Sequence, residues 1–244
     1  MTKIYDALIQ AEKDHLQQSP VDRSEDLAPP KTSSNLTSPI REQLYSVYRA
    51  IAVEKSEGGT VLTFVSARAG EGVSTLVREF AKLASTEMGD RVLLLDATHG
   101  NGRHAESFGV GLSEDCEAVM AGRKELSDAL VAVMEDRLML GAVTLNGTFT
   151  ASITATHQFD EMLKKIRQQF DLVLFDTPPA TISSDALAFA RVSDGVVLVV
   201  EAESTRWQVV KQAKSSIERA GGRVIGVILN KTRRHIPEFI YRRL

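Results

Sequence analysis

The sequence predicts an α/β fold with a doubly wound, mostly parallel sheet, and three observations lead to that prediction. Short apolar runs alternate along the chain with amphipathic helical patterns, as in repeated βα units. Several of these runs are almost continuous in Val, Leu and Ile, which is expected of parallel strands covered on both faces. A glycine-rich turn joins the first run to the helical pattern after it, where sheets of this type bind ligands.

The predicted strands and helices alternate regularly. The expected strands cover residues 60–66, 91–96, 137–143, 171–176, 195–200 and 223–229. The expected helices cover residues 74–88, 114–121, 157–169, 184–192 and 205–220. Each helical pattern separates two strands, so it supplies the crossover connection that parallel pairing requires. The pair Gly221-Gly222 marks the end of the last helix.

The chain divides into three parts by composition. Residues 1–18 have a short helical pattern, and residues 19–38 form a linker rich in Ser, Pro, Asp and Thr. Residues 39–244 form the globular domain, which opens with an amphipathic pattern from Pro39 to Glu54. The N-terminal segment is interpreted either as a frayed tail or as a docking helix on a tether.

Composition excludes several classes of protein. The single cysteine, Cys116, rules out an internal disulfide and a cysteine metal cluster, and it fits a reducing cytosol. The formal net charge of −3 gives no bulk attraction to nucleic acid, so no nucleic-acid partner is expected. No apolar run is long enough for a transmembrane helix, and the N-terminus shows no secretory signal. Work at a membrane would therefore need a partner.

The turn after the first strand, "SARAGEGVST", has the shape of a phosphate-binding loop. The Walker A pattern G-x-x-x-x-G-K-[ST] meets Ala67 at its first glycine, Gly72 at its second, Val73 at its lysine and Ser74 at its hydroxyl. Gly70 and Gly72 permit the backbone torsions that turn successive N–H groups toward a phosphate at a helix N-terminus. The ammonium group that would bridge the outer phosphates is missing. Alone, the stretch is also compatible with a plain βα turn.

Two acidic residues end apolar strands elsewhere in the chain. Asp176 follows Leu-Val-Leu-Phe in the Walker B manner, and Asp96 ends the run that begins at Val92. Carboxylates at strand tips beside a phosphate loop are suited to Mg²⁺, which prefers hard oxygen ligands together with substrate phosphates. Either acid alone could cap a turn. Together with the hydroxyl of Ser74 they predict a magnesium site.

With these motifs in place, the chain resembles the bacterial tyrosine kinases, P-loop proteins of capsule and exopolysaccharide assembly that share the MinD/ParA-like fold. The resemblance begins near Arg41 and is carried by "FVSARAGEGVSTLVREFAKLA", "VLLLDA", "FDLVLFDTPPATISSDALAFARVSDGVVLVVEAEST" and "VIGVILNK". It implies binding of ATP or ADP with Mg²⁺, and Asp96 and Asp176 as catalytic acids. Asn230 matches the base-contacting asparagine of the family. The implied phosphate loop consists of Ala69, Gly70, Glu71, Gly72, Val73, Ser74 and Thr75.

The departures from the family pattern bear on activity. Val73 replaces the catalytic lysine, and Thr98 and Gly100 replace the second acid and the arginine of the second Walker motif. Only Tyr241 remains near the C-terminus as a candidate phosphoacceptor, where the family carries a tyrosine cluster. A positioned cation can be worth roughly 10³-fold in phosphoryl transfer. The sequence therefore predicts weak or absent kinase activity, although the backbone cradle for a nucleotide remains.

The oligomerising E-x-x-R-x-x-R helix of the family is also altered. Glu42 is followed by Tyr45 and Tyr48 where the arginines are expected. The resemblance nevertheless implies a homo-oligomer.

Arg68 occupies the place where MinD/ParA proteins carry a second, signature lysine that reaches the phosphates across a dimer. It is a candidate for the missing charge, and the alternative is a solvated loop arginine. The histidines His99, His104 and His157 lack a ligand spacing and are expected at the surface. The basic C-terminal stretch is either a segment that docks on a membrane partner or lipid, or a helix packed on its own domain.

The leading functional hypothesis is a regulator of exopolysaccharide polymerisation and export. It would be cytoplasmic and peripheral at the inner membrane, recruited by a membrane-bound chain-length determinant (a polysaccharide co-polymerase). One alternative is an active ATP-dependent tyrosine autokinase that uses Arg68 and modifies Tyr241. Another is a MinD/ParA-like positioning ATPase.

Overall fold

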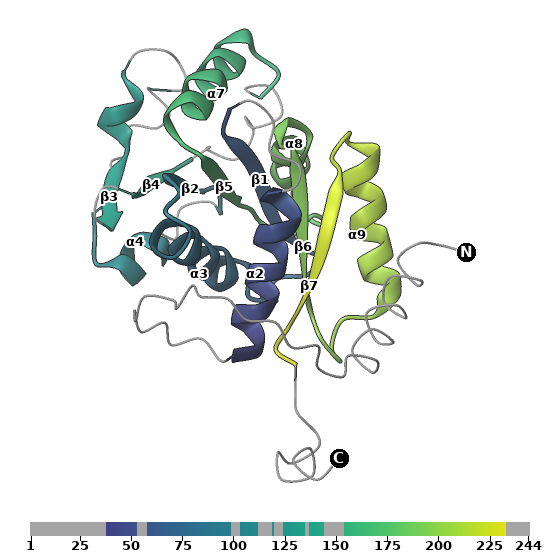
Figure 1. The fold of residues 1–244 in the computed structure, drawn as a ribbon. Coiled ribbons are helices and arrows are strands. Elements are labelled where there is room, and N and C mark those ends of the chain that lie inside the picture. The colour runs from purple at the N-terminus through teal and green to yellow at the C-terminus, as the bar shows by residue number, and fades with distance from the viewer. Residues whose placement is uncertain are drawn as a thin grey trace. The chain divides into compact units, whose positions relative to one another are not determined.

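The computed structural model describes residues 38–52, 58–98, 103–111, 119, 124–134, 137–143 and 154–232. Its centre is a seven-stranded sheet with the strand order β3-β4-β2-β5-β1-β6-β7 (Figure 1). Every neighbouring pair is parallel except β3 and β4, which pair antiparallel at one edge. The predicted doubly wound, mostly parallel α/β architecture is therefore confirmed.

The predicted strands agree closely with the observed ones. The strands are β1 (Thr60–Ser66), β2 (Val92–Asp96), β3 (Val131–Met134), β4 (Leu138–Ala142), β5 (Leu172–Asp176), β6 (Gly195–Glu201) and β7 (Val224–Asn230). All of the expected strands are present within one residue of their predicted ends. The edge strand β3 was not predicted, because four residues that are only partly buried carry too little pattern.

The predicted helices agree with the observed ones within two residues at each end where the structure describes them. They are α2 (Ser38–Ala52), α3 (Val73–Thr86), α4 (Arg103–Phe108), α7 (His157–Gln169), α8 (Ser184–Val192) and α9 (Trp207–Arg219), with a short 3₁₀ helix at Leu126–Ala129. The predicted bounds of α7 and α8 are confirmed. The expected helix at 114–121 lies outside the described residues apart from Val119. The six-residue α4 was not predicted, and it proves important for the site.

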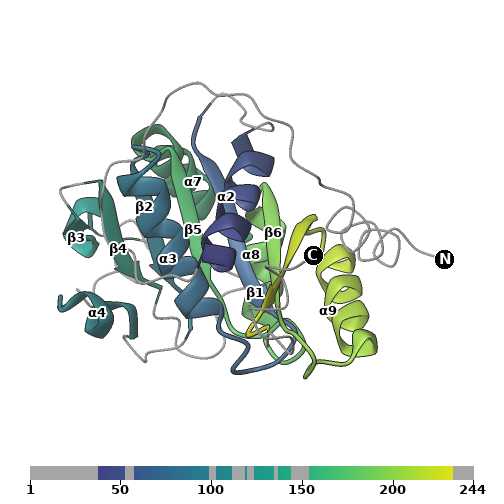
Figure 2. The ribbon, with the colours of Figure 1, turned by 60° about the horizontal axis from the view of Figure 1, so that its bottom comes forward.

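The helices cover both faces of the sheet. Helices α2, α3 and α4 lie on one face, and α7, α8 and α9 lie on the other (Figures 1 and 2). Alternate residues of each strand point to opposite faces, so Phe64 packs on Phe80 of α3 with ring centroids 5.4 Å apart, while Phe175 stacks on Phe189 of α8. This double coverage explains the continuous apolar runs of the central strands.

Helix α2 is anchored to the domain that follows it. Leu44 and Ile51 are buried in the core on the α3 side. Tyr45 bonds through its hydroxyl to Glu87, which also forms a 2.7 Å ion pair with Arg41, and Tyr48 donates to Asp90 Oδ2 at 2.6 Å. The two tyrosines at the positions expected for arginines thus hold α2 against the end of α3 of the same chain.

The predicted segments at 1–18 and 19–38 lie outside the described residues except for Ser38, the first residue of α2. Among the described helices, none combines the length and the apolar character required to cross a lipid bilayer.

Candidate functional site

The parallel register brings the two predicted acids to neighbouring positions. Asp96 of β2 pairs with Asp176 of β5, and Asp176 also pairs with Phe64 near the end of β1. The preceding residues, Leu95 and Phe175, point into the core on the α7 side, so the acids point to the opposite face, toward α3 and α4. The sheet therefore places both carboxylates beside the loop that follows β1.

The loop has the backbone conformation that its glycines allow. Gly70 has φ 85° and Gly72 has φ 92°, in the left-handed region that other residues rarely adopt. Gly72 is the N-cap of α3, and a Cβ atom there would lie 2.3 Å from the Asn230 side-chain nitrogen. Two independent constraints, torsion and close approach, thus require glycine at this position.

Glu71 braces the loop from behind. Its side chain is 2% exposed, and one carboxylate oxygen accepts the Arg68 N–H at 2.7 Å. The other oxygen accepts the Glu201 N–H at 3.1 Å and the Thr205 hydroxyl. The Glu71 carboxylate is therefore committed to β6 and to the segment after it. The resemblance placed Glu71 in the phosphate loop, and in the structure only its main chain is available for a ligand.

Strand β7 supplies a second brace. The Asn230 side-chain amide donates to the Glu71 carbonyl at 2.8 Å, and Lys231 Nζ donates to the Gly70 carbonyl at 2.8 Å. Lys231 also pairs with Glu201 at 3.1 Å. The contribution of Lys231 was not predicted, because its contact depends on the adjacency of β6 and β7 to the loop. We call Glu71, Glu201, Thr205, Asn230 and Lys231 the bracing side of the loop.

Val73, which stands in the lysine position, is the first residue of α3 and is 7% exposed. Its side chain belongs to the core cluster on the α3 face. Of the next two residues, Ser74 is half-buried and Thr75 is exposed, and Ala69 and Gly70 on the approach to the helix are both exposed. The valine therefore serves packing, while the polar positions that flank it remain accessible.

Asp96 is held by its own neighbour. Its Oδ1 atom accepts the Thr98 N–H at 3.0 Å and the Thr98 hydroxyl at 2.5 Å. Thr98 stands where the resemblance expects a second acid. It thus replaces a charge with two hydrogen bonds that orient Asp96.

Asp176 is fully buried and contacts His104, a histidine expected at the surface from its sequence context. His104 of α4 is also fully buried, and His104 Nε2 and Asp176 Oδ2 share a 2.7 Å hydrogen bond. The surface prediction is therefore wrong for His104, whereas it is confirmed for His157, whose side chain is 84% exposed. His99 lies outside the described residues. The short α4 offered too little periodicity to reveal its buried face.

The environment of Asp176 disfavours its charged form. Burial raises the pKa of its carboxyl group above the ordinary range, and the nearby Asp96 adds to the rise. The hydrogen bond with His104 and the proximity of Ser74 act in the opposite direction without cancelling it. We call Val73, Asp96, His104 and Asp176 the acidic side of the loop.

Two further predicted residues are placed differently with respect to the loop. The Arg68 side chain is exposed, and among the described residues it has no hydrogen-bond or ion-pair partner. It is therefore free to reach a ligand at the loop. Tyr241 lies outside the described residues.

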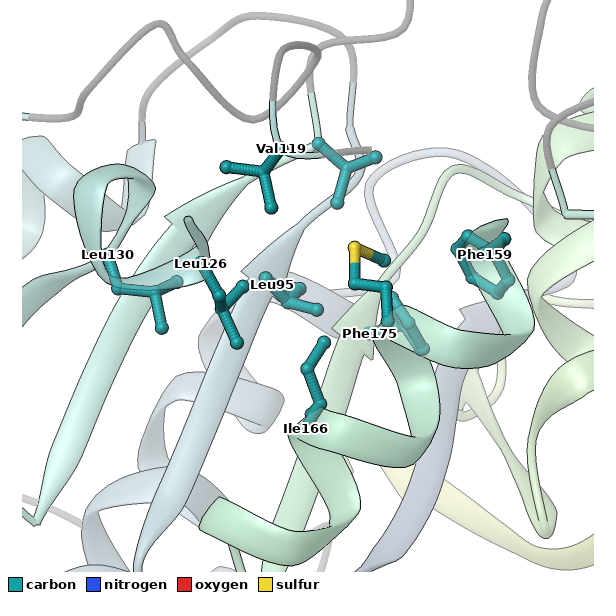
Figure 3. A pocket seen from close by; sticks show the side chains of 9 residues that line it. Leu95, Val119, Leu126, Leu130, Phe159, Ile166 and Phe175 are labelled. Carbon is teal, nitrogen blue, oxygen red and sulfur yellow. The ribbon is translucent and has the colours of Figure 1, made fainter. Parts of the chain in front are cut away.

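A cavity elsewhere in the domain has a different character. It has a volume of about 20 Å³ and lies on the α7 face (Figure 3). Its lining is apolar and consists of Leu95, Val119, Leu126, Leu130, Val143, Phe159, Met162, Ile166 and Phe175. It has room for about one water molecule, and it offers no polar partner. This cavity is a packing defect of the core.

The side chains at the loop fit a phosphate ligand with a divalent cation. The glycine torsions, the start of α3 and the paired acids supply the cradle and the oxygen ligands. In addition, among the described residues, the buried atoms His104 Nδ1 and Asp176 Oδ1 have no hydrogen-bond partner. Buried polar atoms without partners are uncommon, and a bound ion or water is a frequent explanation.

Comparison with known proteins finds relatives in sequence and structures of similar fold. A tyrosine-protein kinase CpsD of Streptococcus agalactiae is 29% identical over 202 residues, covering 81% of this chain and 86% of the relative. The crystal structure of the chimerical protein CapA2B2 matches with a TM-score of 0.71 at 22% identity, over 81% of this chain and 87% of that one. The MinD cell division protein of Aquifex aeolicus matches with a TM-score of 0.58 at 20% identity, over 76% of this chain and 73% of that one.

The family model described as an AAA domain matches residues 59–224, which include the loop, both acids and strand β6. The chain therefore belongs to the AAA-domain family of P-loop proteins, where its relatives are tyrosine-protein kinases of the CpsD type and its fold is shared with MinD.

Proposed function

We propose that this chain is a nucleotide-binding regulator of bacterial exopolysaccharide or capsule polymerisation and export, with weak or absent protein kinase activity. The observation that carries the proposal is the contrast at the start of α3. The backbone cradle keeps its glycine torsions. Val73 occupies the position of the lysine that would contact the phosphates, but its side chain packs into the core instead.

The chain supplies identifiable groups for the ligand. The main chain of residues 69–75 would hold the phosphates of ATP or ADP, with Asn230 as a contact for the base. Ser74, Asp96 and Asp176 would hold the cation. When bound, a divalent cation neutralises phosphate charge and orients the phosphate chain. The protein orients Asp96 through Thr98 and excludes water from Asp176 by burial.

Without a lysine, the loop can bind phosphates through its main chain, but it does not stabilise the negative charge that develops on the phosphoryl group during transfer. Phosphoryl transfer depends on this electrostatic stabilisation more than on any covalent step by the protein. Nucleotide binding would then control self-association or partner binding. The family resemblance supports a membrane-bound chain-length determinant as that partner, and hence a position in the cytoplasm at the inner membrane.

The proposal is tested by measuring equilibrium binding of ATP and ADP, with and without Mg²⁺, to wild-type protein and to Asp176→Ala. Saturable binding to the wild type that weakens in the variant is expected. Incubation with labelled ATP and Mg²⁺ then measures transfer, and we expect little or no label. Absence of nucleotide binding to the wild type would refute the proposal.

One observation favours an active autokinase as a second candidate. The exposed Arg68 side chain is free to supply the missing positive charge. In that case wild-type protein incorporates label, Arg68→Ala does not, and the label is found on Tyr241 or another tyrosine. A positioning ATPase of the MinD/ParA kind would instead show ATP-dependent dimerisation together with binding to lipid or DNA.

A further inference from the structure

We propose that Asp96, His104 and Asp176 form a binding site for a divalent transition-metal ion that accepts an imidazole ligand, in place of a site selective for Mg²⁺. The inference rests on the proposed nucleotide site for its biological use, because the ion would lie beside the bound phosphates. Binding of the ion itself requires only these three side chains.

The positions of the three side chains allow them to bind one ion together. Each of the three residues offers one ligand atom, and these atoms all lie within 4.8 Å of one another. An ion with bonds of about 2.1 Å holds neighbouring ligand atoms about 3.0–3.4 Å apart. His104 Nε2 and Asp176 Oδ2 are 2.7 Å apart, at hydrogen-bond distance, so these two atoms would have to move slightly apart to share an ion. Small movements of side chains would complete the site.

Burial and unmet hydrogen-bonding capacity point to the same place. Asp96 is 5% exposed, and His104 and Asp176 are fully buried. The described residues pair these two buried carboxylates through hydrogen bonds, one with His104 at Asp176 and two from Thr98 at Asp96. A divalent cation would neutralise the negative charge that the carboxylates carry. Among the described residues, Asp176 Oδ1 is left without a partner, and an ion at the carboxylates would provide one.

The ligand set decides which ions fit. Mg²⁺ takes oxygen ligands in a near-ideal octahedron and retains several waters, for which a dry site with an imidazole is poorly suited. An imidazole suits ions such as Zn²⁺ and Fe²⁺, and Co²⁺ binds to similar sites. His104 would therefore shift the preference of the site away from Mg²⁺. With three protein ligands, the ion would also stay bound in the absence of nucleotide.

The test uses the full chain, freed of metal by chelation, and Co²⁺ as the probe. Visible absorption reports the coordination environment of bound Co²⁺, and calorimetry gives the affinities for Co²⁺ and Mg²⁺ separately. Wild type is compared with His104→Leu and His104→Gln, and with His157→Gln as a control at an exposed histidine. We expect one Co²⁺ to bind per chain with a distinct absorption band, more tightly than Mg²⁺.

Removal of the imidazole should weaken Co²⁺ binding by about 10–100-fold or more. His157→Gln should bind Co²⁺ as the wild type does. If the wild type shows no saturable Co²⁺ band, or if both His104 variants retain it, the inference is refuted. Urea unfolding of each variant shows whether it is folded, and the polar His104→Gln carries the test if His104→Leu is not.

The two proposals can fail separately. All ion titrations are made without nucleotide, so ion binding by a chain that does not bind ATP would overturn only the proposed function. Nucleotide binding with Mg²⁺ by a chain that has no Co²⁺ site would overturn only this inference.

Discussion

The bracing side and the acidic side of the loop differ in how completely their polar groups are paired. On the bracing side, the Glu71 carboxylate, the Asn230 amide and the Lys231 ammonium each bond to protein atoms. On the acidic side, one buried atom each of His104 and Asp176 has no hydrogen-bond partner within the described part of the chain. Val73, at the lysine position, has an apolar side chain that packs in the core. Contacts within the protein therefore hold the shape of the loop, whereas the unpaired polar atoms on the acidic side are available to a ligand.

This difference explains how the loop can keep its form after losing its lysine. A lysine in a phosphate loop interacts with the ligand, so its replacement removes little that holds the empty loop. A bracing residue interacts with the protein, so its replacement should distort the loop itself. Substitutions on the two sides can test this division.

Replacement of Glu71 by alanine should have the largest effect on stability. It would leave the Arg68 and Glu201 N–H groups and the Thr205 hydroxyl without their acceptor. Each unsatisfied donor costs about 1–3 kcal/mol, so a loss of about 3–5 kcal/mol in unfolding free energy is expected. Urea denaturation measures it.

The matched control is Glu79→Ala, which removes an ion pair with Lys82 within one helix. That change should cost less than about 0.5 kcal/mol. Equal losses in the two variants would show that the loop does not depend on its brace.

Gly72→Ala should come next, because it combines backbone strain with a collision. The left-handed torsion costs a non-glycine residue about 1–2 kcal/mol, and the new methyl group would meet the Asn230 amide at 2.3 Å. Gly109→Ala is the control, since Gly109 also has positive φ but has open space around it. We expect Gly72→Ala to exceed its control by at least about 1 kcal/mol in urea unfolding. A difference of zero would mean that Asn230 moves aside freely.

Val73→Lys should restore a charge to the acidic side. A charge-assisted hydrogen bond is worth about 1.5–3 kcal/mol, so ATP affinity should rise by roughly tenfold or more. Val73→Met provides a chain of similar length without the charge and should leave affinity nearly unchanged. Equilibrium binding of ATP measures both. If lysine and methionine act alike, the cradle does not hold phosphates where a lysine at this position can reach them.

Lys231→Met should have the smallest effect. Its ammonium is about half exposed, and exposed ion pairs contribute about 0–1 kcal/mol. The left-handed torsion of residue 231 is the same in both proteins, so it does not contribute to the difference. Unfolding free energy should fall by less than about 1 kcal/mol. A loss as large as that of Glu71→Ala would show that the brace from β7 is as important as the one from Glu71.

Much of the fold could be predicted because the strands and helices depend on local sequence patterns. Strand β1 and helices α7 and α8 have the predicted bounds, since apolar runs and helical periodicity are properties of neighbouring residues. The elements that were missed, β3 and α4, are too short for such a pattern. The placement of Asp96 and Asp176 at strand tips near the loop could also be predicted, because parallel strands bring their carboxyl ends to one edge. The direct pairing of β2 with β5 is known only from the structure.

The partners of the site residues could not be predicted in the same way. Glu71 and Glu201 are distant in sequence and meet only because β6 lies beside β1. His104 lies 72 positions before Asp176, and its burial depends on how α4 packs on the sheet. No local signal distinguishes this histidine from the exposed His157.

The α/β alternation, the glycine loop without its lysine and the two acids that end strands can all be recognised in the amino-acid sequence. These features are local, because they depend on periodicity and on the torsions that single residues allow. Three other features emerge only in the folded chain: the Glu71 side chain turns away from the ligand side, Val73 packs in the core, and His104 lies beside the two acids. Those outcomes depend on which surfaces come together when the sheet is covered, and hence on contacts between residues far apart in the chain.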